Sequence, residues 1–219
     1  MIKVERLNKP QVLVQNAASW TRKLENAKTK LEIDKAESKY RHEEIKNTLK
    51  AMFHGKCAYC ESQILHIDYG HIEHFRPKRN PKFRHLTFEW TNLLLACGVC
   101  NSRENKGTKF PEEAENGPLI NPSDDNPAQH FDFIFDDITK IASIYGSTLR
   151  GELTERVLGL NRPELLRYRS KQVKILVYLA LKASENDSRA TALLQQACDE
   201  SSEYAAFARM LKLRFCQRL

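Results

Sequence analysis

Two Cys-x-x-Cys pairs constrain this chain more than any other feature of its sequence. They are Cys57–Cys60 and Cys97–Cys100, and 36 residues separate them, more than in a short zinc ribbon. Each pair can present two thiolates from a tight turn, and two such turns supply the four corners of a tetrahedral zinc site. Redox chemistry, disulfides and four unligated buried thiols are the alternatives; a redox motif needs only one pair, and disulfides are rare in a reducing compartment. We therefore predict a structural Zn²⁺ bound by these four cysteines, with an insert between the two pairs.

The apolar pattern and the charge place the chain in a broad class. The longest unbroken apolar run, residues 175–181, has seven residues, whereas a membrane span needs about 18 or more. Residues 1–10 are charged and lack the apolar core of a secretory signal. We therefore expect a cytoplasmic protein with no membrane segment. The net charge of +7 suits a polyanionic partner, although an excess of this size also occurs where it only maintains solubility.

Hydrophobic periodicity divides the chain into four parts. The predicted parts are a helical segment at 1–53, a cysteine-rich insert at 54–110, an acidic loop and hairpin at 111–150, and a helical segment at 151–219. The fold class that we predict is therefore mainly α with a small α+β insert.

Within these parts the pattern indicates individual elements. A polar stretch at 26–39 is either a break or a solvated span between two helices. Residues 131–135 and 138–145 alternate well enough for the two strands of a hairpin. Further helices are predicted at 154–160, 163–183 and 188–213, the second with Pro163 in its first turn.

The insert contains a constellation of His, Glu and Asn residues. It includes His71-Ile-Glu73-His74, then Asn92 shortly before the second cysteine pair, then Asn101 directly after it. This pattern resembles the HNH endonuclease family, which sets a ββα-metal motif between zinc knuckles. The resemblance implies a helical scaffold around a zinc-stapled nuclease motif at 54–110. It also implies that His74 lies on the first strand, that Asn92 steadies the intervening loop, and that Asn101 lies on a helix after the second knuckle.

Phosphodiester hydrolysis explains why these residue types are needed. A histidine can deprotonate water near neutral pH, so His74 is the predicted general base. A hard cation such as Mg²⁺ prefers oxygen ligands, which Glu73 and Asn101 can supply, while His71 suits Mn²⁺. On a strand, His71 and Glu73 share one face and His74 lies on the other, so the ligand set stays open. The chain departs from the family pattern in having Glu before the base and Asn at the third position.

Basic residues flank both halves of the constellation. Phosphate contacts position a nucleic acid without reading its sequence, and these residues lie where its backbone is expected to approach; a merely solvated basic face is the alternative. The predicted contacts are Arg76, Lys78, Arg79, Arg103 and Lys106.

A narrower resemblance covers roughly residues 50–170. The strings HIEHFRPK and CNSRENKG, and the WTNLLLAC approach to the second cysteine pair, resemble the PtuB-type HNH subunits of Septu and retron-associated anti-phage defence systems. The resemblance implies an effector nuclease that cuts DNA in preference to RNA. It also implies control by a PtuA-type ABC ATPase and, in retron forms, by a reverse transcriptase with its RNA–DNA hybrid. The alternative is a zinc-stapled module that binds nucleic acid or protein without catalysis.

Overall fold

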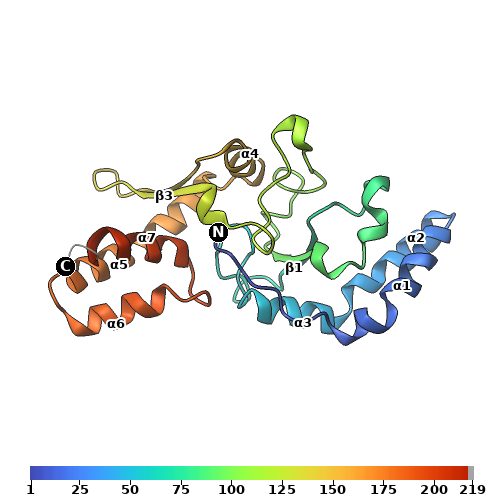
Figure 1. Cartoon of the computed structure of the whole chain (residues 1–219), viewed down its shortest axis with the longest axis horizontal. Helices are drawn as coiled ribbons and strands as arrows, with labels where there is room; N and C mark the ends of the chain where they lie inside the picture. The colour runs from blue at the N-terminus through green and yellow to red at the C-terminus, as the bar shows by residue number, and fades with distance from the viewer. Residues whose placement is uncertain (217–219) are drawn as a thin grey trace. The chain divides into compact units, whose positions relative to one another are not determined.

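A computed structural model describes residues 1–216 as a helix-rich chain with two small antiparallel sheets (Figure 1). It divides into two compact units. Unit 1 contains residues 1–4 and 59–63 and the chain from Pro111 onward, and unit 2 contains residues 5–58 and 64–110. None of the described helices combines the length and apolar character that crossing a membrane requires.

Three helices open unit 2. Helix α1 (Gln11–Asn26) begins after Pro10 and α3 (Glu43–Met52) follows the 3-10 turn η1 (Ser38–Arg41); each buries one apolar stripe. Helix α2 (Lys30–Glu37) lies between them and buries no residue. The Thr29 side chain accepts a hydrogen bond from Glu32 N, and the Glu32 carboxylate accepts one from Thr29 N, which forms a capping box. The polar stretch at 26–39 is therefore largely a solvated helix.

The insert in unit 2 is built on a two-stranded sheet. Strand β1 (His71–His74) pairs antiparallel with β2 (Leu93–Ala96), with His74 opposite Leu93. Two 3-10 turns, η2 (Pro81–Leu86) and η3 (Trp90–Asn92), fill the connection. The four residues of β2 are buried, which fixes the sheet against the core of the unit. The helix implied after the second cysteine pair is absent from the described structure: residues 98–108 form turns and one bend.

Unit 1 contains the second sheet and four helices. Strands β3 (Phe131–Phe135) and β4 (Ala142–Gly146) form the predicted hairpin. Helix α4 (Leu149–Leu158) begins five residues before the predicted start, because Thr148 caps it by accepting from Gly151 N. Helix α5 (Pro163–Ser184) begins at the predicted residue, with Pro163 in its first turn, and ends one residue beyond the predicted end.

The single helix predicted at 188–213 is wrong. The structure has α6 (Ser188–Ala197) and α7 (Ala205–Cys216), separated by turns. The intervening residues 199–203 are polar and rich in side chains that compete for backbone hydrogen bonds. Tyr204 then adopts a left-handed φ of 55° and is buried, which lets the chain reverse and α7 pack against α5 and α6.

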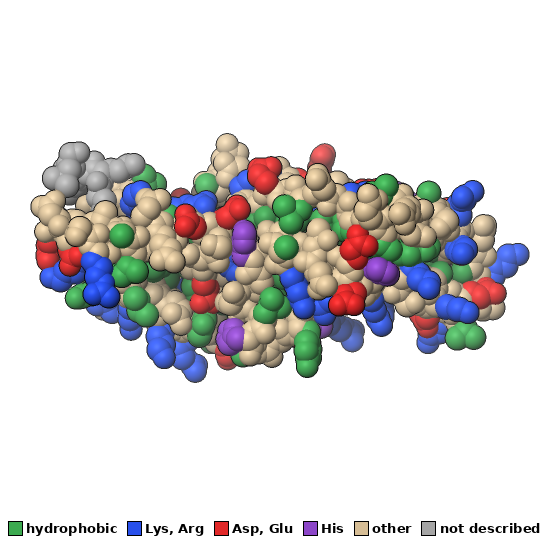
Figure 2. Space-filling model, turned by 90° about the horizontal axis from the view of Figure 1, so that it is seen from below, with side chains coloured by type: hydrophobic (Ala, Val, Ile, Leu, Met, Phe, Trp, Pro, Cys, Tyr) green, Lys and Arg blue, Asp and Glu red, His purple; other side chains and the backbone are tan. Residues whose placement is uncertain are grey.

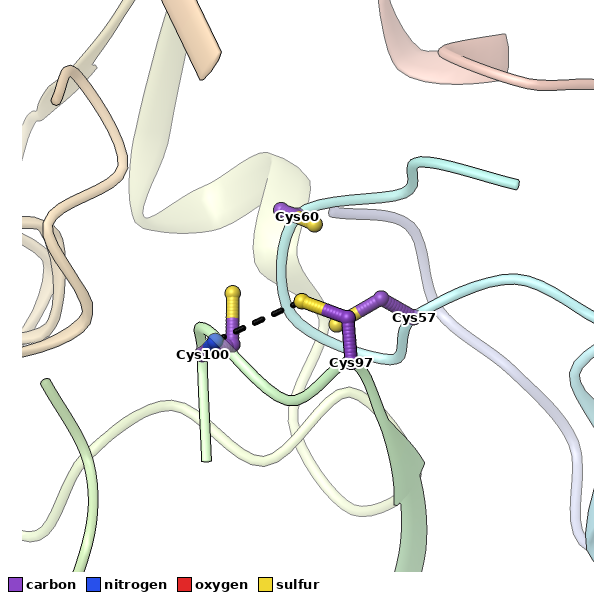
Figure 3. A group of neighbouring side chains, drawn as sticks. All are labelled: Cys57, Cys60, Cys97 and Cys100. Carbon is purple, nitrogen blue, oxygen red and sulfur yellow. Dashed lines mark hydrogen bonds between the residues drawn. The ribbon is translucent and has the colours of Figure 1, made fainter. Parts of the chain in front are cut away.

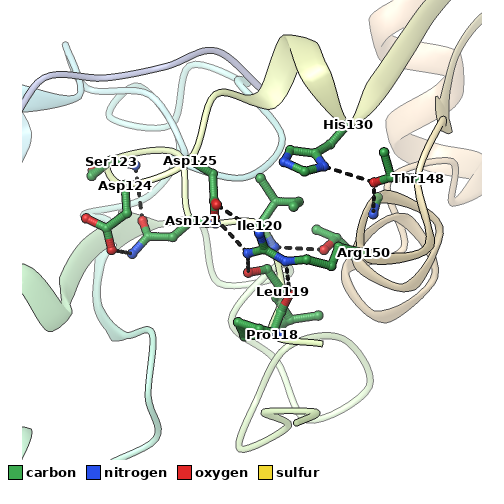
Figure 4. Close-up of polar contacts among 12 residues, drawn as sticks. Pro118, Leu119, Ile120, Asn121, Ser123, Asp124, Asp125, His130, Thr148 and Arg150 are labelled. Carbon is green, nitrogen blue, oxygen red and sulfur yellow. Dashed lines mark hydrogen bonds and ion pairs between the residues drawn. The ribbon is translucent and has the colours of Figure 1, made fainter. Parts of the chain in front are cut away.

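The acidic loop before the hairpin is held by one arginine of α4 (Figure 4). The Arg150 guanidinium forms a two-armed ion pair with Asp125, at 3.0 and 2.9 Å. It also donates to the carbonyls of Pro118 and Leu119 at 2.9 and 3.2 Å. Because one side chain binds both ends of the segment 118–125, a loop without regular secondary structure keeps a defined path. Short 3-10 turns, η4 (Glu113–Glu115) and η5 (Pro127–Gln129), precede and follow it.

Candidate functional site

The four predicted metal-ligating cysteines converge. The Sγ atoms of Cys57, Cys60, Cys97 and Cys100 all lie within 4.8 Å of one another (Figure 3). A Zn–S bond of about 2.3 Å in a tetrahedral site places sulfur atoms about 3.8 Å apart, so the cluster is the right size for zinc. Cys100 N also donates to Cys97 Sγ at 3.3 Å, a contact that stabilises a thiolate. Elsewhere among the side chains that the structure describes, those of residues 1–215, no group of three or more His, Cys, Asp or Glu comes together in this way.

A cavity of about 490 Å³ in unit 2 contains most of the remaining candidates. The β1 residues Glu73 and His74 line one part of it, and Asn101 lines another. Thus the structure brings together residues that are separated by 27 positions in the sequence. Its other lining residues are Tyr40, Ile72, Pro77, Lys78, Arg79, Arg103, Gly107 and Thr108.

His74 is held in one orientation at the wall of this cavity. Its side chain is buried, with the residue 6% exposed, and Nε2 lies 3.0 Å from the carbonyl oxygen of Thr87. A carbonyl oxygen can only accept, so the neutral ring carries its proton on Nε2 and leaves a lone pair on Nδ1. The Tyr40 ring packs edge-on against the imidazole, with ring centroids 4.7 Å apart. Sequence reasoning missed Tyr40, because nothing in the pattern of the N-terminal helices links it to the insert.

Burial keeps His74 neutral. Desolvation is the largest cause that lowers its pKa, from 6.5 to about 3. The hydrogen bond to Thr87 raises the pKa, and the charges of Lys78 and Lys106 lower it further. At neutral pH the Nδ1 lone pair is therefore available to accept a proton.

Asn92 ties together the two ends of the connection between β1 and β2. Its Oδ1 accepts from Arg76 N at 2.7 Å, and its Nδ2 donates to the carbonyls of Arg76 and Leu86 at 3.0 and 3.1 Å. The side chain is buried, so these bonds are shielded from water. Asn92 therefore acts on the loop and does not line the cavity.

Glu73 and Lys106 form a buried ion pair behind the base. Lys106 Nζ lies 3.0 Å from Glu73 Oε1 and 3.4 Å from the carbonyl oxygen of His74. Lys106 is fully buried, so its ammonium group faces the protein and not an approaching phosphate. Gly107 follows with φ at +44°, and a Cβ there would lie 3.1 Å from backbone atoms of the preceding turn. The chain thus makes a tight turn directly after the residue whose side chain points into the protein.

His71 lies apart from the cavity that His74 lines. Its side chain is 51% exposed and Nε2 is 3.7 Å from Asp68 Oδ2. It lines a neighbouring cavity of about 440 Å³, together with Asp68, Tyr69 and, at the boundary with the first cavity, Asn101. The structure therefore groups Glu73 and Asn101 with His74, and places His71 in an adjoining hollow that shares Tyr40, Ile72 and Asn101 with the first.

The flanking cations are placed differently from one another. Lys78 lines the His74 cavity and pairs with Glu37 at 2.5 Å, while Arg79 and Arg103 line the cavity and are exposed. Arg76 stacks against the rings of Phe75 and Phe110, with its guanidinium carbon 6.0 and 5.6 Å from the ring centroids. Arg79 and Arg103 are thus the predicted phosphate contacts best placed to meet a substrate.

Comparison with known proteins identifies the family of the chain. Residues 57–107 match the HNH endonuclease family. The chain is 35% identical to Septu protein PtuB of Bacillus mycoides (strain KBAB4), over 80% of this chain and 68% of that protein. It is 32% identical to Septu protein PtuB of Bacillus thuringiensis, over 77% of this chain and 58% of that protein. It is 27% identical to the Retron Vc95 putative HNH endonuclease of Vibrio cholerae serotype O1 biovar El Tor, over 60% of this chain and 63% of that protein. No solved structure matches the chain.

Proposed function

Because this chain belongs to the Septu PtuB family and is an HNH endonuclease, we propose that it hydrolyses nucleic-acid phosphodiester bonds, DNA in preference to RNA, with His74 as the general base. The observation that carries this proposal is the orientation of the imidazole: Nε2 donates to Thr87 and Nδ1 keeps its lone pair. The cavity beside this histidine is lined by cations and by the amide of Asn101, which a purely structural role of the histidine does not explain.

The proposed step is an in-line displacement at phosphorus. His74 Nδ1 takes a proton from a water molecule, whose oxygen forms a bond to phosphorus as the bond to the 3′ oxygen breaks. The Thr87 carbonyl stabilises the imidazolium that forms, because it accepts the Nε2–H bond throughout. Arg79 and Arg103 hold the phosphate against the cavity wall.

A divalent ion completes the proposed chemistry. Mg²⁺ is usually bound by one or two carboxylates together with water and substrate phosphate, and the oxygens of Glu73 and Asn101, which both line the cavity, fit this donor set. A bound Mg²⁺ or Mn²⁺ supplies a Lewis acid for the charge on the phosphate and on the departing oxygen. Lys106 fixes the Glu73 carboxylate in place for this role. His71 is not included in the proposed ligand set, since its half-exposed imidazole lies beside Asp68, with Nε2 3.7 Å from Asp68 Oδ2.

We propose that the four-cysteine cluster binds one structural Zn²⁺. The cluster size and the amide that faces Cys97 support zinc, and Cys97 follows β2 directly. The ion would therefore stabilise the sheet at the end where Ala96 pairs with His71, the end opposite His74, without taking part in the reaction.

We further propose that the chain acts in anti-phage defence under the control of a PtuA-type ABC ATPase. Support comes from the relatives described above, of which two are named Septu protein PtuB and one a retron HNH endonuclease. In a retron-linked setting the partner would include a reverse transcriptase with its RNA–DNA hybrid. Co-expression of the chain with the products of neighbouring genes, followed by affinity purification, tests this: recovery of an ATPase in a stable complex supports it.

The direct test of the nuclease proposal compares two histidine variants. We expect His74→Ala to abolish Mg²⁺- or Mn²⁺-dependent cleavage of DNA by the chain, with its partner present, while the circular dichroism spectrum and the zinc content are unchanged. His66→Ala, which alters an exposed histidine of the same unit outside the cavity, should cleave like the wild type. Cleavage that survives in His74→Ala would contradict the assignment of the base. A wild type that binds DNA but never cleaves it would favour the binding-module alternative.

A further inference from the structure

A second hollow in unit 2 lies between helices α1 and α2. It has a volume of about 860 Å³, larger than the cavity at His74. Arg22 and Lys23 on α1 and Lys35 and Lys39 at the α2 side line it, so cations face it from both walls. We call these four residues and the space between them the basic groove. On the face seen in Figure 2, blue Lys and Arg side chains gather over the end where α1 and α2 lie.

The cations of the basic groove are not neutralised within the protein. In the described part of the chain, none of these four side chains takes part in an ion pair. The one carboxylate that lines the groove belongs to Glu32, and it accepts the backbone N–H groups of Lys28 and Thr29 at 2.9 and 3.0 Å. Four cations against this one carboxylate leave the groove a net positive charge.

Helix α2 itself calls for an explanation. It buries no side chain, so it contributes little to a core, yet a capping box fixes its start. Lys35 lies on α2 and Lys39 on the 3-10 turn η1 that follows it, and both line the same hollow. On the opposite wall, Trp20 packs edge-on against Phe88 at 5.4 Å, which holds α1 in place. The result is a hollow with exposed cations on both of its walls.

The basic groove adjoins the candidate active site within the same unit. Lys39 lines the groove, and the next residue, Tyr40, lines the His74 cavity and packs on the imidazole. At the end of α2, Glu37 pairs with Lys78, which also lines that cavity. A polyanion that reaches from the His74 cavity to the groove would pass over residues 37–40, which separate the two.

We propose that the basic groove binds the phosphodiester backbone of the nucleic-acid substrate outside the cleavage site. This inference rests on the proposed nuclease function and adds to it a second site, made by the N-terminal helices. The groove would contact phosphates and not base edges, so it would increase affinity and orient the strand without selecting a sequence. Phosphate contacts of this kind make affinity depend steeply on salt.

Binding measurements test the groove without relying on catalysis. The full chain carrying His74→Ala is titrated into a fluorescein-labelled DNA duplex, and the affinity is followed by anisotropy over a range of salt concentrations; an RNA duplex of the same sequence serves as a second probe. We expect R22Q/K23Q/K35Q/K39Q to lower the DNA affinity at least about tenfold and to reduce the slope of log K against log salt by up to about 3.6, at about 0.9 per lost contact. The matched control, R167Q/K171Q/K174Q/R189Q, removes the same charge from exposed positions of α5 and α6 and should change both much less.

A second measurement needs no variant. DNA should protect Lys23, Lys35 and Lys39 of the otherwise unaltered chain from chemical acetylation, as read by mass spectrometry, while Lys171 and Lys174 stay reactive. If the groove variant binds like its control, or the groove lysines are not protected in the complex, the inference is overturned. If the wild type binds DNA through the groove but does not cleave it, only the nuclease proposal is overturned. A groove variant that loses affinity for RNA but not for DNA would also contradict the inference as applied to a DNA-cutting enzyme.

Discussion

At the residue scale, the site depends on how one buried imidazole is kept neutral and oriented. His74 lies near two lysines and is shielded from water, and both conditions disfavour its protonated form. The carbonyl of Thr87 determines which ring nitrogen carries the proton, while Tyr40 limits the rotation of the ring. Orientation is therefore achieved with groups from three separate segments of unit 2.

The depressed pKa of His74 has a consequence for stability. Its folded pKa of about 3 lies below its ordinary value of 6.5, so between these values protons bind the unfolded chain in preference to the folded one. The contribution of the neutral imidazole is full above pH 6.5 and is lost as the pH falls toward 3. We expect the wild type to lose about 2 kcal/mol of unfolding free energy, relative to His74→Gln, between about pH 7 and pH 5. Urea unfolding of both proteins at the two pH values measures this; a difference that does not change with pH would show that His74 protonates normally.

The Glu73–Lys106 pair gives a second prediction at this scale. Both side chains are buried, so replacing Lys106 by Met leaves a carboxylate without its partner and should cost roughly 3–5 kcal/mol of unfolding free energy. The double variant Glu73→Gln with Lys106→Met should recover a large part of this loss, because no unpaired charge remains. Urea unfolding of the four proteins forms a double-mutant cycle. Equal and additive losses in the two single variants would mean that the pair does not act as a unit.

At the scale of elements, the sheet that carries His74 is too small to be stable alone. Strands β1 and β2 have four residues each, and an isolated two-stranded sheet is marginal in water. Two connections extend it: Ala58 N donates to the carbonyl of Leu95 at 2.8 Å, and Cys97 continues β2 into the cysteine cluster. The cluster therefore lies where it can anchor one end of a sheet that has no further strands to stabilise it.

Removal of the proposed zinc should accordingly disturb the site from a distance. We expect the purified chain to contain about one equivalent of zinc, and Cys100→Ser to lose that metal, to melt at a lower temperature and to lose cleavage even with added Mg²⁺. The control is Cys198→Ser, which alters a cysteine outside the cluster. Metal content by mass spectrometry and thermal unfolding by circular dichroism supply the two readouts. If Cys100→Ser keeps full stability and activity, the cluster is not a structural metal site.

At the scale of the whole molecule, charge and chain path are distributed unevenly. Residues 51–110 carry a net charge of +4 and residues 111–150 a net charge of −6. Unit 1 also contains two short segments from earlier in the chain, 1–4 and 59–63, in addition to the continuous part that begins at Pro111. Within unit 1 these segments are well held: Val4 N donates to the Pro122 carbonyl, and the Ser62 and Tyr204 hydroxyls lie 2.8 Å apart.

This path predicts that the nuclease motif cannot be cut out at the end of unit 2. A fragment of residues 1–110 keeps the segments 1–4 and 59–63 but loses the part of unit 1 on which they pack, so we expect it to melt at a lower temperature and less cooperatively than the full chain. Co-expression with a fragment of residues 111–219 should restore a single transition. Thermal unfolding followed by circular dichroism makes the comparison, and a fragment of residues 1–110 as stable as the full chain would contradict it.

Several features followed from the sequence because they depend on local pattern. The spacing of the four cysteines predicted a cluster that the structure confirms, and residue alternation and a helix-starting proline predicted the β3–β4 hairpin and α5. The HNH pattern identified the family. The hairpin and α5 depend on interactions between residues near in sequence. The four cysteines were expected to meet because a tetrahedral metal site needs four ligands.

Other features were decided only by the tertiary structure. The sequence does not show that Tyr40 packs on His74, that Lys106 is buried against Glu73, or that His71 lines a different cavity. The residue spacing also does not reveal the turns that replace a helix at 98–108 or divide α6 from α7. A charged side chain reads the same in sequence whether it faces solvent or a buried partner, and only long-range packing decides which. The sequence by itself thus determined the chemistry available to this protein, while the tertiary structure determined which of its charged groups can meet a substrate.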